Sequence, residues 1–227
     1  LSSISEKIIT NKNTTLILGL LRTDENKIFN SLVFLNSKGD IIYNYDKIKL
    51  VPFGEYIPFR QYLGDFTDIF APKDFTSGKL KSNLTINGFE NIITLICYEI
   101  LFTNEIVSRL SKNTNLLINI TNDAWFGKTI GPYQHLALAK IKAVEFGLPL
   151  ARVANTGISA YVSPYGEIIG KIALDNKGVK TFNLVSALDQ TLYRIYGDYI
   201  FIVLILILLG INTLYIFNFK EEMLNEK

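Results

Sequence analysis

Residues 91–99 read Asn-Ile-Ile-Thr-Leu-Ile-Cys-Tyr-Glu, an apolar run that ends at the only cysteine of the chain. Its β-branched composition predicts a buried strand, and helical spacing begins a few residues later. Cys97 would then lie at the carboxyl end of a strand, where the sites of α/β sheets concentrate. Such a thiol is a candidate nucleophile, provided that a nearby cation or base converts it to the thiolate. Without such a neighbour, a lone cysteine is more often a small buried hydrophobe.

Strands and helices alternate around this run. Further apolar segments predict strands at residues 15–21, 31–35, 41–45, 115–121 and 148–154, and a hairpin that joins 158–163 to 167–172. Helical spacing covers residues 102–110 and 132–146. This alternation predicts a layered α/β domain. Residues 52–88 are turn-rich and only weakly periodic, which is typical of a functional loop or lid.

Composition excludes several classes of function. The chain has 227 residues, 48% of them hydrophobic, which is enough for one domain with one core. Its net charge is only +2 and no block of like charge occurs, so no nucleic-acid partner is expected. One cysteine cannot form an internal disulfide, and with a single histidine it cannot supply an ordinary zinc site. We therefore expect no metal and no cofactor.

A second strong signal lies near the C-terminus. The 21 residues from Tyr199 to Phe219 carry no charge and are rich in Ile, Leu, Val and Phe. As a helix they would span roughly 30 Å, the thickness of a hydrocarbon core. A buried core helix is the alternative, but core helices rarely stay apolar on every face for so long. The predicted organisation is a domain at 1–197, a transmembrane helix at 198–219 and a polar tail at 220–227.

Two more segments complete the candidate site. A polar, aromatic string, Asn-Ile-Thr-Asn-Asp-Ala-Trp-Phe-Gly, occupies residues 119–127, after the next predicted strand. Lys47 and Lys49 lie in Tyr-Asp-Lys-Ile-Lys-Leu-Val-Pro-Phe-Gly-Glu-Tyr, residues 45–56. Judged from their positions alone, both lysines are expected to be solvated charges at a strand end. The only imidazole, His135, is the other candidate partner for the thiol.

Taken together, these motifs show a family resemblance. Residues 45–56, Ile-Cys-Tyr-Glu at 96–99, the string at 119–127 with Gly-Pro-Tyr-Gln-His at 131–135, and Arg-Val-Ala-Asn-Thr-Gly-Ile-Ser at 152–159 occur in one order. In that order the chain resembles the carbon-nitrogen hydrolase (nitrilase) superfamily and, within it, the apolipoprotein N-acyltransferases of bacterial lipoprotein maturation. The resemblance implies a four-layer αββα sandwich followed by one membrane helix.

The resemblance also implies roles for particular residues. Cys97 matches the nucleophile and Lys47 the lysine of a Glu-Lys-Cys triad, whereas Lys49 is the less favoured choice. The expected supporting residues are Glu55, Tyr98 and Glu99. Trp125, and more loosely Phe126, match a wall for an acyl chain or its glycerol. With the lysine in place His135 is not needed as a base, and a structural role is favoured for it.

By the same resemblance, the enzyme would move an acyl chain from a phospholipid to the diacylglyceryl-cysteine of an apolipoprotein through a thioester. It would be held in the bacterial inner membrane with the domain in the periplasm. One departure stands out, because no Pro-Glu motif for the triad glutamate precedes Pro52, and Glu6 does not match it. The chain is therefore expected to be N-terminally truncated and inactive alone, with a separate N-terminal chain as a further partner.

Two other interpretations stay open at this point. One is a membrane-tethered amidase that hydrolyses a small carbon-nitrogen substrate, as most members of the superfamily do. The other is a non-catalytic fragment or subunit that lacks the triad glutamate.

Overall fold

The polypeptide path is given by a computed structural model that describes residues 13–63, 73–80, 84–86 and 89–225. Glu6, which the sequence comparison singled out, lies outside the described residues. The chain divides into two compact units, Leu1–Leu188 and Asp189–Lys227, which are described separately.

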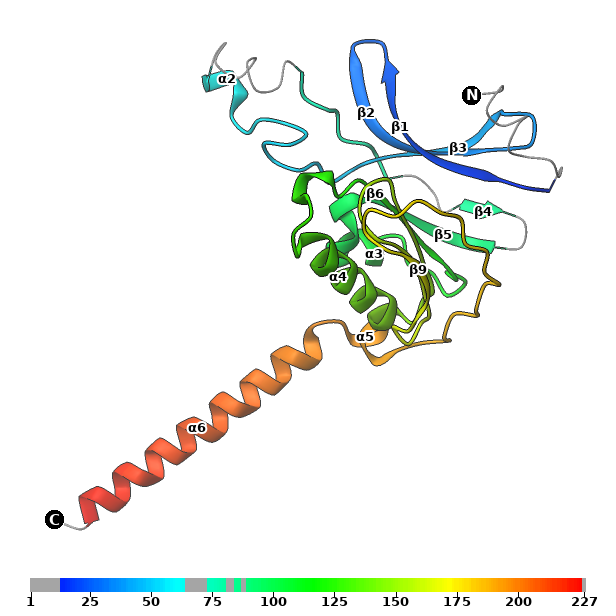
Figure 1. The fold of residues 1–227 in the computed structure, drawn as a ribbon. Helices are drawn as coiled ribbons and strands as arrows, with labels where there is room; N and C mark the ends of the chain where they lie inside the picture. The colour runs from blue at the N-terminus through cyan, green and yellow to red at the C-terminus, as the bar shows by residue number, and fades with distance from the viewer. Residues whose placement is uncertain (1–12, 64–72, 81–83, 87–88, 226–227) are drawn as a thin grey trace. The chain divides into compact units, whose positions relative to one another are not determined.

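Two β-sheets form the centre of the first unit (Figure 1). The smaller sheet is an antiparallel meander of β1 (Leu16–Asp24), β2 (Lys27–Leu35) and β3 (Ile41–Asp46). The larger sheet has the order β4-β5-β6-β7-β8-β9, with bounds Leu84–Ile86, Phe89–Ile96, Leu117–Thr121, Leu150–Ala154, Ser159–Val162 and Ile168–Ile172. Its strands β5, β6 and β7 run parallel, and the remaining pairs are antiparallel. Parallel central strands with helical crossovers are the arrangement that alternating elements predict.

Helices connect the parallel strands. A 3-10 turn, η2 (Cys97–Leu101), and a short helix, α3 (Thr103–Val107), lead from β5 toward β6. A second 3-10 turn, η3 (Ala124–Phe126), and the long helix α4 (Gly131–Phe146) lead from β6 to β7. Helices α3 and α4 lie on one face of the larger sheet, while the smaller sheet packs on its opposite face (Figure 1). The architecture is therefore a mixed α/β arrangement in which two sheets pack face to face.

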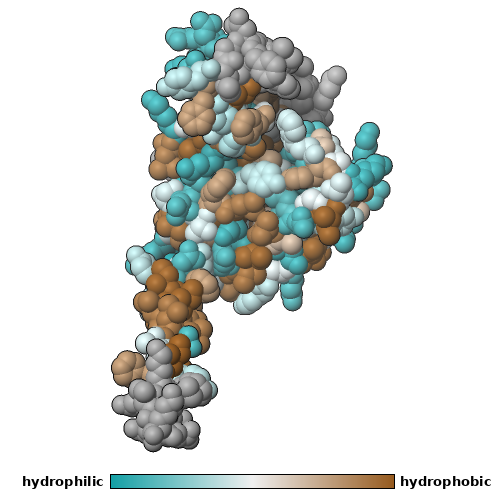
Figure 2. Space-filling model, turned by 90° about the vertical axis from the view of Figure 1, so that its left-hand side faces the viewer, coloured by the Kyte–Doolittle hydropathy of each residue, from teal (hydrophilic) through white to brown (hydrophobic). Residues whose placement is uncertain are grey.

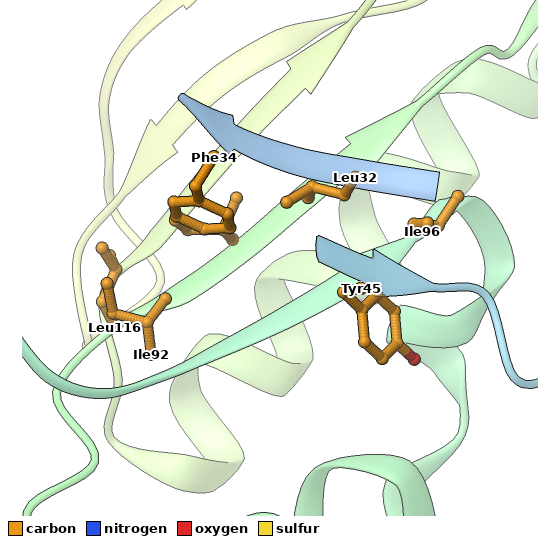
Figure 3. Packing of buried hydrophobic residues seen from close by; sticks show 7 residues of the cluster. Leu32, Phe34, Tyr45, Ile92, Ile96 and Leu116 are labelled. Atoms are coloured by element: carbon orange, nitrogen blue, oxygen red, sulfur yellow. The ribbon is translucent and has the colours of Figure 1, made fainter. Parts of the chain in front are cut away.

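The core between the two sheets follows from strand alternation. Buried side chains from both sheets form one cluster, made of Leu32, Phe34, Tyr45, Ile92, Ile96, Leu116 and Ile118 (Figure 3). Members from one strand are two or four residues apart, because every second side chain of a strand points to the same face. The intervening residues of β5, Ile93 and Leu95, are also fully buried and point to the opposite face of the sheet. A strand that is apolar on both faces is therefore buried on both, which fixes the position of the segment that ends at Cys97.

The structure corrects the sequence prediction at several elements. The helix predicted for residues 102–110 is only five residues long, and a separate 3-10 turn begins before it, at Cys97. Strand β2 begins at Lys27, earlier than predicted, because β1 and β2 form a long hairpin. The weakly periodic segment 52–88 contains the short helix α2 (Arg60–Leu63) and the edge strand β4. Residues 64–72, 81–83 and 87–88 of that segment lie outside the described residues.

The second unit consists of a short helix, α5 (Leu192–Tyr196), and a long one, α6 (Tyr199–Asn225). Residues Tyr199–Phe217 have a mean hydropathy of 2.8, and none of that stretch is buried. In the part of the chain that the structure describes, α6 is the one helix long and apolar enough to cross a membrane by length and composition. Figure 2 shows apolar side chains over the face of α6 that it presents. The helix continues into the segment 220–227 that the sequence predicts as a polar tail.

Candidate active site

Cys97 lies where β5 ends and η2 begins. Its φ is +54°, a left-handed conformation that non-glycine residues rarely adopt, whereas Ile96 before it is extended. Conformations of this kind cost about 1–3 kcal/mol each, and they persist where the surrounding structure holds them. The thiol is partly exposed. The sequence therefore placed the cysteine correctly at a strand end, and the structure adds a sharp backbone turn at that residue.

Lys47 follows β3 directly and is buried, with only 1% of its surface exposed. Its Nζ lies 2.6 Å from Glu55 Oε2. The backbone is fixed as well, because Lys47 N donates to Asn30 O at 2.8 Å and Lys47 O accepts from Gly78 N at 2.8 Å. A Cβ at Gly78 would lie 2.1 Å from Asp46 O, so only glycine allows this approach. The expectation of a solvated Lys47, drawn from its position alone, is wrong, because tertiary packing covers the strand end.

Glu55 holds the lysine. In addition to the Lys47 ion pair, its Oε2 accepts from Val51 N at 2.8 Å, and its Oε1 accepts from the Asn30 side chain at 2.8 Å. Both carboxylate oxygens are thus occupied by donors. This arrangement suits a residue that orients an ammonium group better than one that takes up protons.

Glu99 connects the lysine loop to the cysteine strand. This carboxylate is fully buried, and its Oε1 accepts from Tyr45 Oη at 2.9 Å, Ile48 N at 2.7 Å and Lys49 N at 3.0 Å. Its Oε2 accepts from Ile96 N at 2.8 Å. Burial raises the pKa of Glu99, and the backbone donors partly counteract that rise.

The consequence is that the segments that carry Lys47 and Cys97 are held together. One carboxylate binds the backbone directly after Lys47 and the backbone directly before Cys97. Among the residues that the structure describes, no hydrogen bond joins the Lys47 ammonium to the thiol. Lys49 differs from Lys47, since its side chain is 52% exposed and its Nζ lies 3.7 Å from Glu105 Oε1.

Aromatic residues surround the cysteine turn. The Tyr98 ring stacks on His135, with centroids 4.9 Å apart and an interplanar angle of 14°. Phe126 packs edge-on against both rings, at 5.9 Å from Tyr98 and 6.3 Å from His135. Trp125 is 79% exposed, so the two residues expected to form a substrate wall lie in different environments. Their role toward a substrate stays a prediction.

A buried polar network lies behind Cys97, and His135 is the one member to which the sequence analysis assigned a role. Asn119 Nδ2 donates to Cys97 O at 3.2 Å, and Asn119 Oδ1 accepts from Arg152 Nη1. Arg152 Nη2 donates to Asp123 Oδ2 at 2.8 Å, and His135 Nδ1 lies 2.8 Å from Asp123 Oδ1. The signal in the sequence was present, because a charged residue inside an apolar strand such as 148–154 requires a buried partner.

Electrostatics in this network favour the ion pair. Burial alone would raise the pKa of Asp123, but contacts with His135, Arg152 and Thr121 outweigh it and lower the pKa. For Arg152 burial lowers the pKa, which Asp123 opposes. Since the side chains of Asp123 and Arg152 are both fully buried, the pair is charged and shielded from water. His135 therefore contributes to a structural network, which supports the structural role favoured from the sequence.

The geometry defines a class of protein. Cys97 lies on a strained strand end and Lys47 is buried on the Glu55 carboxylate. The Glu99 carboxylate ties the backbone after the lysine to the backbone before the cysteine within a two-sheet α/β fold. This is a mixed α/β protein of the nitrilase-like type, in which Cys97 and Lys47 are the candidate catalytic residues. The carbon-nitrogen hydrolase family matches residues 5–192, and the chain belongs to that family.

Within this family, the chain is similar in sequence to apolipoprotein N-acyltransferases. The chain is 43% identical over 175 residues to the apolipoprotein N-acyltransferase of Rhizobium leguminosarum bv. trifolii (strain WSM2304), a match that covers 73% of this chain and 33% of that protein. It is 36% identical over 197 residues to that of Bradyrhizobium diazoefficiens, covering 82% of this chain and 36% of that protein. The chain thus spans about a third of the length of these relatives.

Solved structures support the fold. An amidase from Nesterenkonia sp. superposes with a TM-score of 0.55 at 20% identity, covering 77% of this chain and 62% of that one. A variant of the amidase from Nesterenkonia sp. AN1, with a TM-score of 0.55 and 18% identity over 76% of this chain and 62% of that one, carries the acetamide moiety of fluoroacetamide covalently on its active-site cysteine.

Proposed function

We propose that this chain carries the nucleophile of an apolipoprotein N-acyltransferase, which moves an acyl chain from a phospholipid to the α-amino group of a lipoprotein's diacylglyceryl-cysteine. The observation that carries the proposal is the cysteine-lysine site. A partly exposed Cys97 is linked through the Glu99 carboxylate to the backbone that follows Lys47, a lysine that is buried on Glu55. The similarity to N-acyltransferases over 73–82% of the chain supports the choice of substrates.

The first half-reaction loads the cysteine. The Cys97 thiolate attacks the ester carbonyl carbon of the phospholipid, and a C–S bond forms while the carbonyl oxygen becomes an oxyanion. Collapse of this intermediate breaks the C–O bond, and the lysophospholipid leaves as an alcohol after taking up a proton. The Lys47 ammonium would stabilise both the thiolate and the oxyanion, the latter together with a backbone N–H near Tyr98.

The second half-reaction unloads it. The amine nitrogen of the lipoprotein attacks the thioester carbon, a C–N bond forms, the C–S bond breaks and the nitrogen loses a proton. A base is therefore needed for the thiol and again for the amine. Glu55 and Glu99 are occupied as acceptors of several donors each, so neither suits this task. We assign the base to a third glutamate, the one that the family resemblance places in a Pro-Glu motif. Because residues 1–227 contain no Pro-Glu motif, we expect them alone to transfer no acyl chain.

The remaining assignments follow from the same proposal. Trp125, exposed on η3, would contact the acyl chain or its glycerol, and Phe126 would support it through its contact with Tyr98. Helix α6 would anchor the enzyme in the bacterial inner membrane, with the domain at 1–197 in the periplasm and residues 220–227 in the cytoplasm. A four-layer αββα sandwich would require a further helical layer on the smaller sheet.

A labelled phospholipid tests the proposal. The protein expressed from its full reading frame, in detergent micelles, should form an acyl-thioester on Cys97 that mass spectrometry detects, and the Cys97→Ser variant should form none. Transfer of the label to a diacylglyceryl peptide should follow. Retention of the thioester in the variant would reject Cys97 as the nucleophile. Hydrolysis of small amides without any thioester from phospholipid would instead support a membrane-tethered amidase.

A further inference from the structure

We propose that Asn119 and Arg152 are positioning residues that hold the backbone of Cys97 so that its thiol stays in the field of Lys47. The inference rests on the proposed function for its catalytic meaning, but its geometry does not. Neither residue contacts the lysine in any hydrogen bond given by the structure. Asn119 acts instead on the carbonyl of Leu95, two residues before the nucleophile, and on the carbonyl of Cys97 itself, and Arg152 acts through Asn119.

The strand register places these residues in one row. Leu95 of β5 pairs with Asn119 of β6, and Asn119 pairs with Arg152 of β7. In-register partners on parallel strands project to the same face, here the face that carries α4 and its His135. A polar amide and a guanidinium thus replace apolar side chains at the position next to the cysteine turn.

Arg152 fixes which way the Asn119 amide points. A guanidinium can only donate hydrogen bonds, so the Asn119 atom that it contacts must be the carbonyl oxygen Oδ1. The amide nitrogen then faces the cysteine strand, where it donates to Leu95 O and to Cys97 O, at 3.2 Å in both cases. Without the arginine, the two orientations of the amide would be chemically similar and the clamp would not be defined.

Arg152 is in turn held in place from behind. Asp123 Oδ2 accepts from its Nη2 at 2.8 Å, and Asp123 Oδ1 accepts from Thr121 Oγ1 at 2.9 Å. Gly157 has a φ of +131°, and a Cβ there would lie 2.6 Å from Asp123 Oδ2. The loop after β7 therefore lies close against the Asp123 carboxylate, and this carboxylate binds the guanidinium on the side away from Asn119.

The clamp acts where the backbone is strained. The chain changes from extended at Ile96 (φ −109°, ψ 121°) to left-handed at Cys97 (φ +54°), and the Asn119 amide binds the carbonyl on each side of that change. Strained conformations persist when their surroundings over-determine them. Release of the clamp would let Cys97 relax, and its thiol would lose its fixed place relative to the Lys47 ammonium. The stabilisation of the thiolate by that cation would then be lost.

The rate of thiol alkylation tests this inference without any phospholipid. Cys97 is the only cysteine, so iodoacetamide reports on it alone in residues 1–227 held in detergent micelles. Asn119→Leu keeps the shape of the side chain and adds no charge. We expect it to slow alkylation at neutral pH about tenfold, because the thiol is no longer held in the position in which Lys47 would favour its reactive form.

A double-mutant cycle separates positioning from loss of folding. In a Lys47→Ala background, where there is no cation to be positioned against, Asn119→Leu should change the rate less than about twofold. Asn115→Leu is the matched control, because Asn115 Oδ1 is buried with no partner among the described residues. This substitution should leave the rate of Cys97 alkylation unchanged. Asn119→Asp, which keeps its pairing with Arg152, is the second variant if Asn119→Leu does not fold.

The outcomes are distinct. The inference would be overturned if both Asn119 variants were alkylated at the wild-type rate. It would also be overturned if Asn119→Leu still slowed alkylation tenfold in the Lys47→Ala background. If the cycle behaves as expected but the full reading frame forms no thioester from phospholipid, the proposed function fails while the positioning role stands.

Discussion

At the scale of single residues, the two glutamates nearest the site have different tasks. Glu55 orients the side chain of Lys47, whereas Glu99 orients the backbone directly after the lysine and directly before the cysteine. Both are surrounded by donors. A carboxylate with this many donors is a fixed acceptor, and its replacement would disturb geometry before it disturbed proton transfer.

Lys47→Ala should lower acyl transfer by about 10²- to 10³-fold in the protein expressed from its full reading frame, because a buried cation beside the developing oxyanion would be lost. Lys49→Ala is the control and should be mild, since that side chain is half exposed. The rate of thioester formation from labelled phospholipid measures both. Equal activity of the two variants would contradict the assignment of Lys47.

Asp123→Asn should destabilise the domain in a pH-dependent way. The pKa of Asp123 is lowered in the folded protein, so its carboxylate stabilises the fold above its unfolded pKa of about 3.9, and this stabilisation is lost as the pH falls through the folded value. Removal of one partner of a buried ion pair costs about 3–5 kcal/mol. Urea unfolding followed by circular dichroism should show this difference at pH 7 and a smaller one near pH 3. A difference that does not change with pH would refute the ionised pair.

At the scale of elements, the junction from β5 to η2 matters most. The helical spacing after Cys97 predicts a longer helix than the structure contains, because Ile100 and Ile106 are buried by packing of a 3-10 turn and a short helix. Periodicity indicates which side chains are buried, and it does not distinguish one nine-residue α-helix from a 3-10 turn followed by a shorter α-helix. For this reason the sequence could not predict that a 3-10 turn begins at Cys97 itself.

Helix α6 makes a prediction of its own. Leu208→Arg places a charge near the middle of an apolar stretch of 19 residues, at a cost to insertion of about 2.5–3.5 kcal/mol. We expect native protein to stay in the membrane pellet after carbonate extraction and the variant to be partly released. Tyr165→Arg, at an exposed loop position of the first unit, is the control and should remain in the pellet. Release of the native protein would exclude α6 as an anchor.

At the scale of the whole molecule, the interface between the two sheets carries the site. Lys47 follows a strand of the smaller sheet and Cys97 follows a strand of the larger one, so their approach depends on how the sheets pack (Figure 3). Any change that lets one sheet shift over the other should separate the lysine from the cysteine.

Phe34→Ala should therefore reduce both stability and reactivity. Phe34 is fully buried between the sheets, and truncation of such a side chain costs about 3–5 kcal/mol. We expect a lower urea midpoint and slower alkylation of Cys97 in the fraction that stays folded. Leu21→Ala, on the exposed surface of β1, should change neither by much. An unaltered midpoint in Phe34→Ala would show that the inter-sheet core is not what holds the fold.

The sequence by itself determined the strand that ends at Cys97, the alternation of strands and helices, and the long apolar helix at the C-terminus. These features are local, because composition and side-chain period within one segment suffice to predict them. Only the tertiary structure decided that Lys47 is buried on Glu55, that Glu99 ties two distant segments together, and that Asn119 and Arg152 lie behind the nucleophile. The contacts of Glu99, Asn119 and Arg152 join residues that are far apart in the sequence, and Lys47 is buried only because the rest of the chain packs around its loop. The energy of such contacts depends on burial, which the sequence of one segment does not encode.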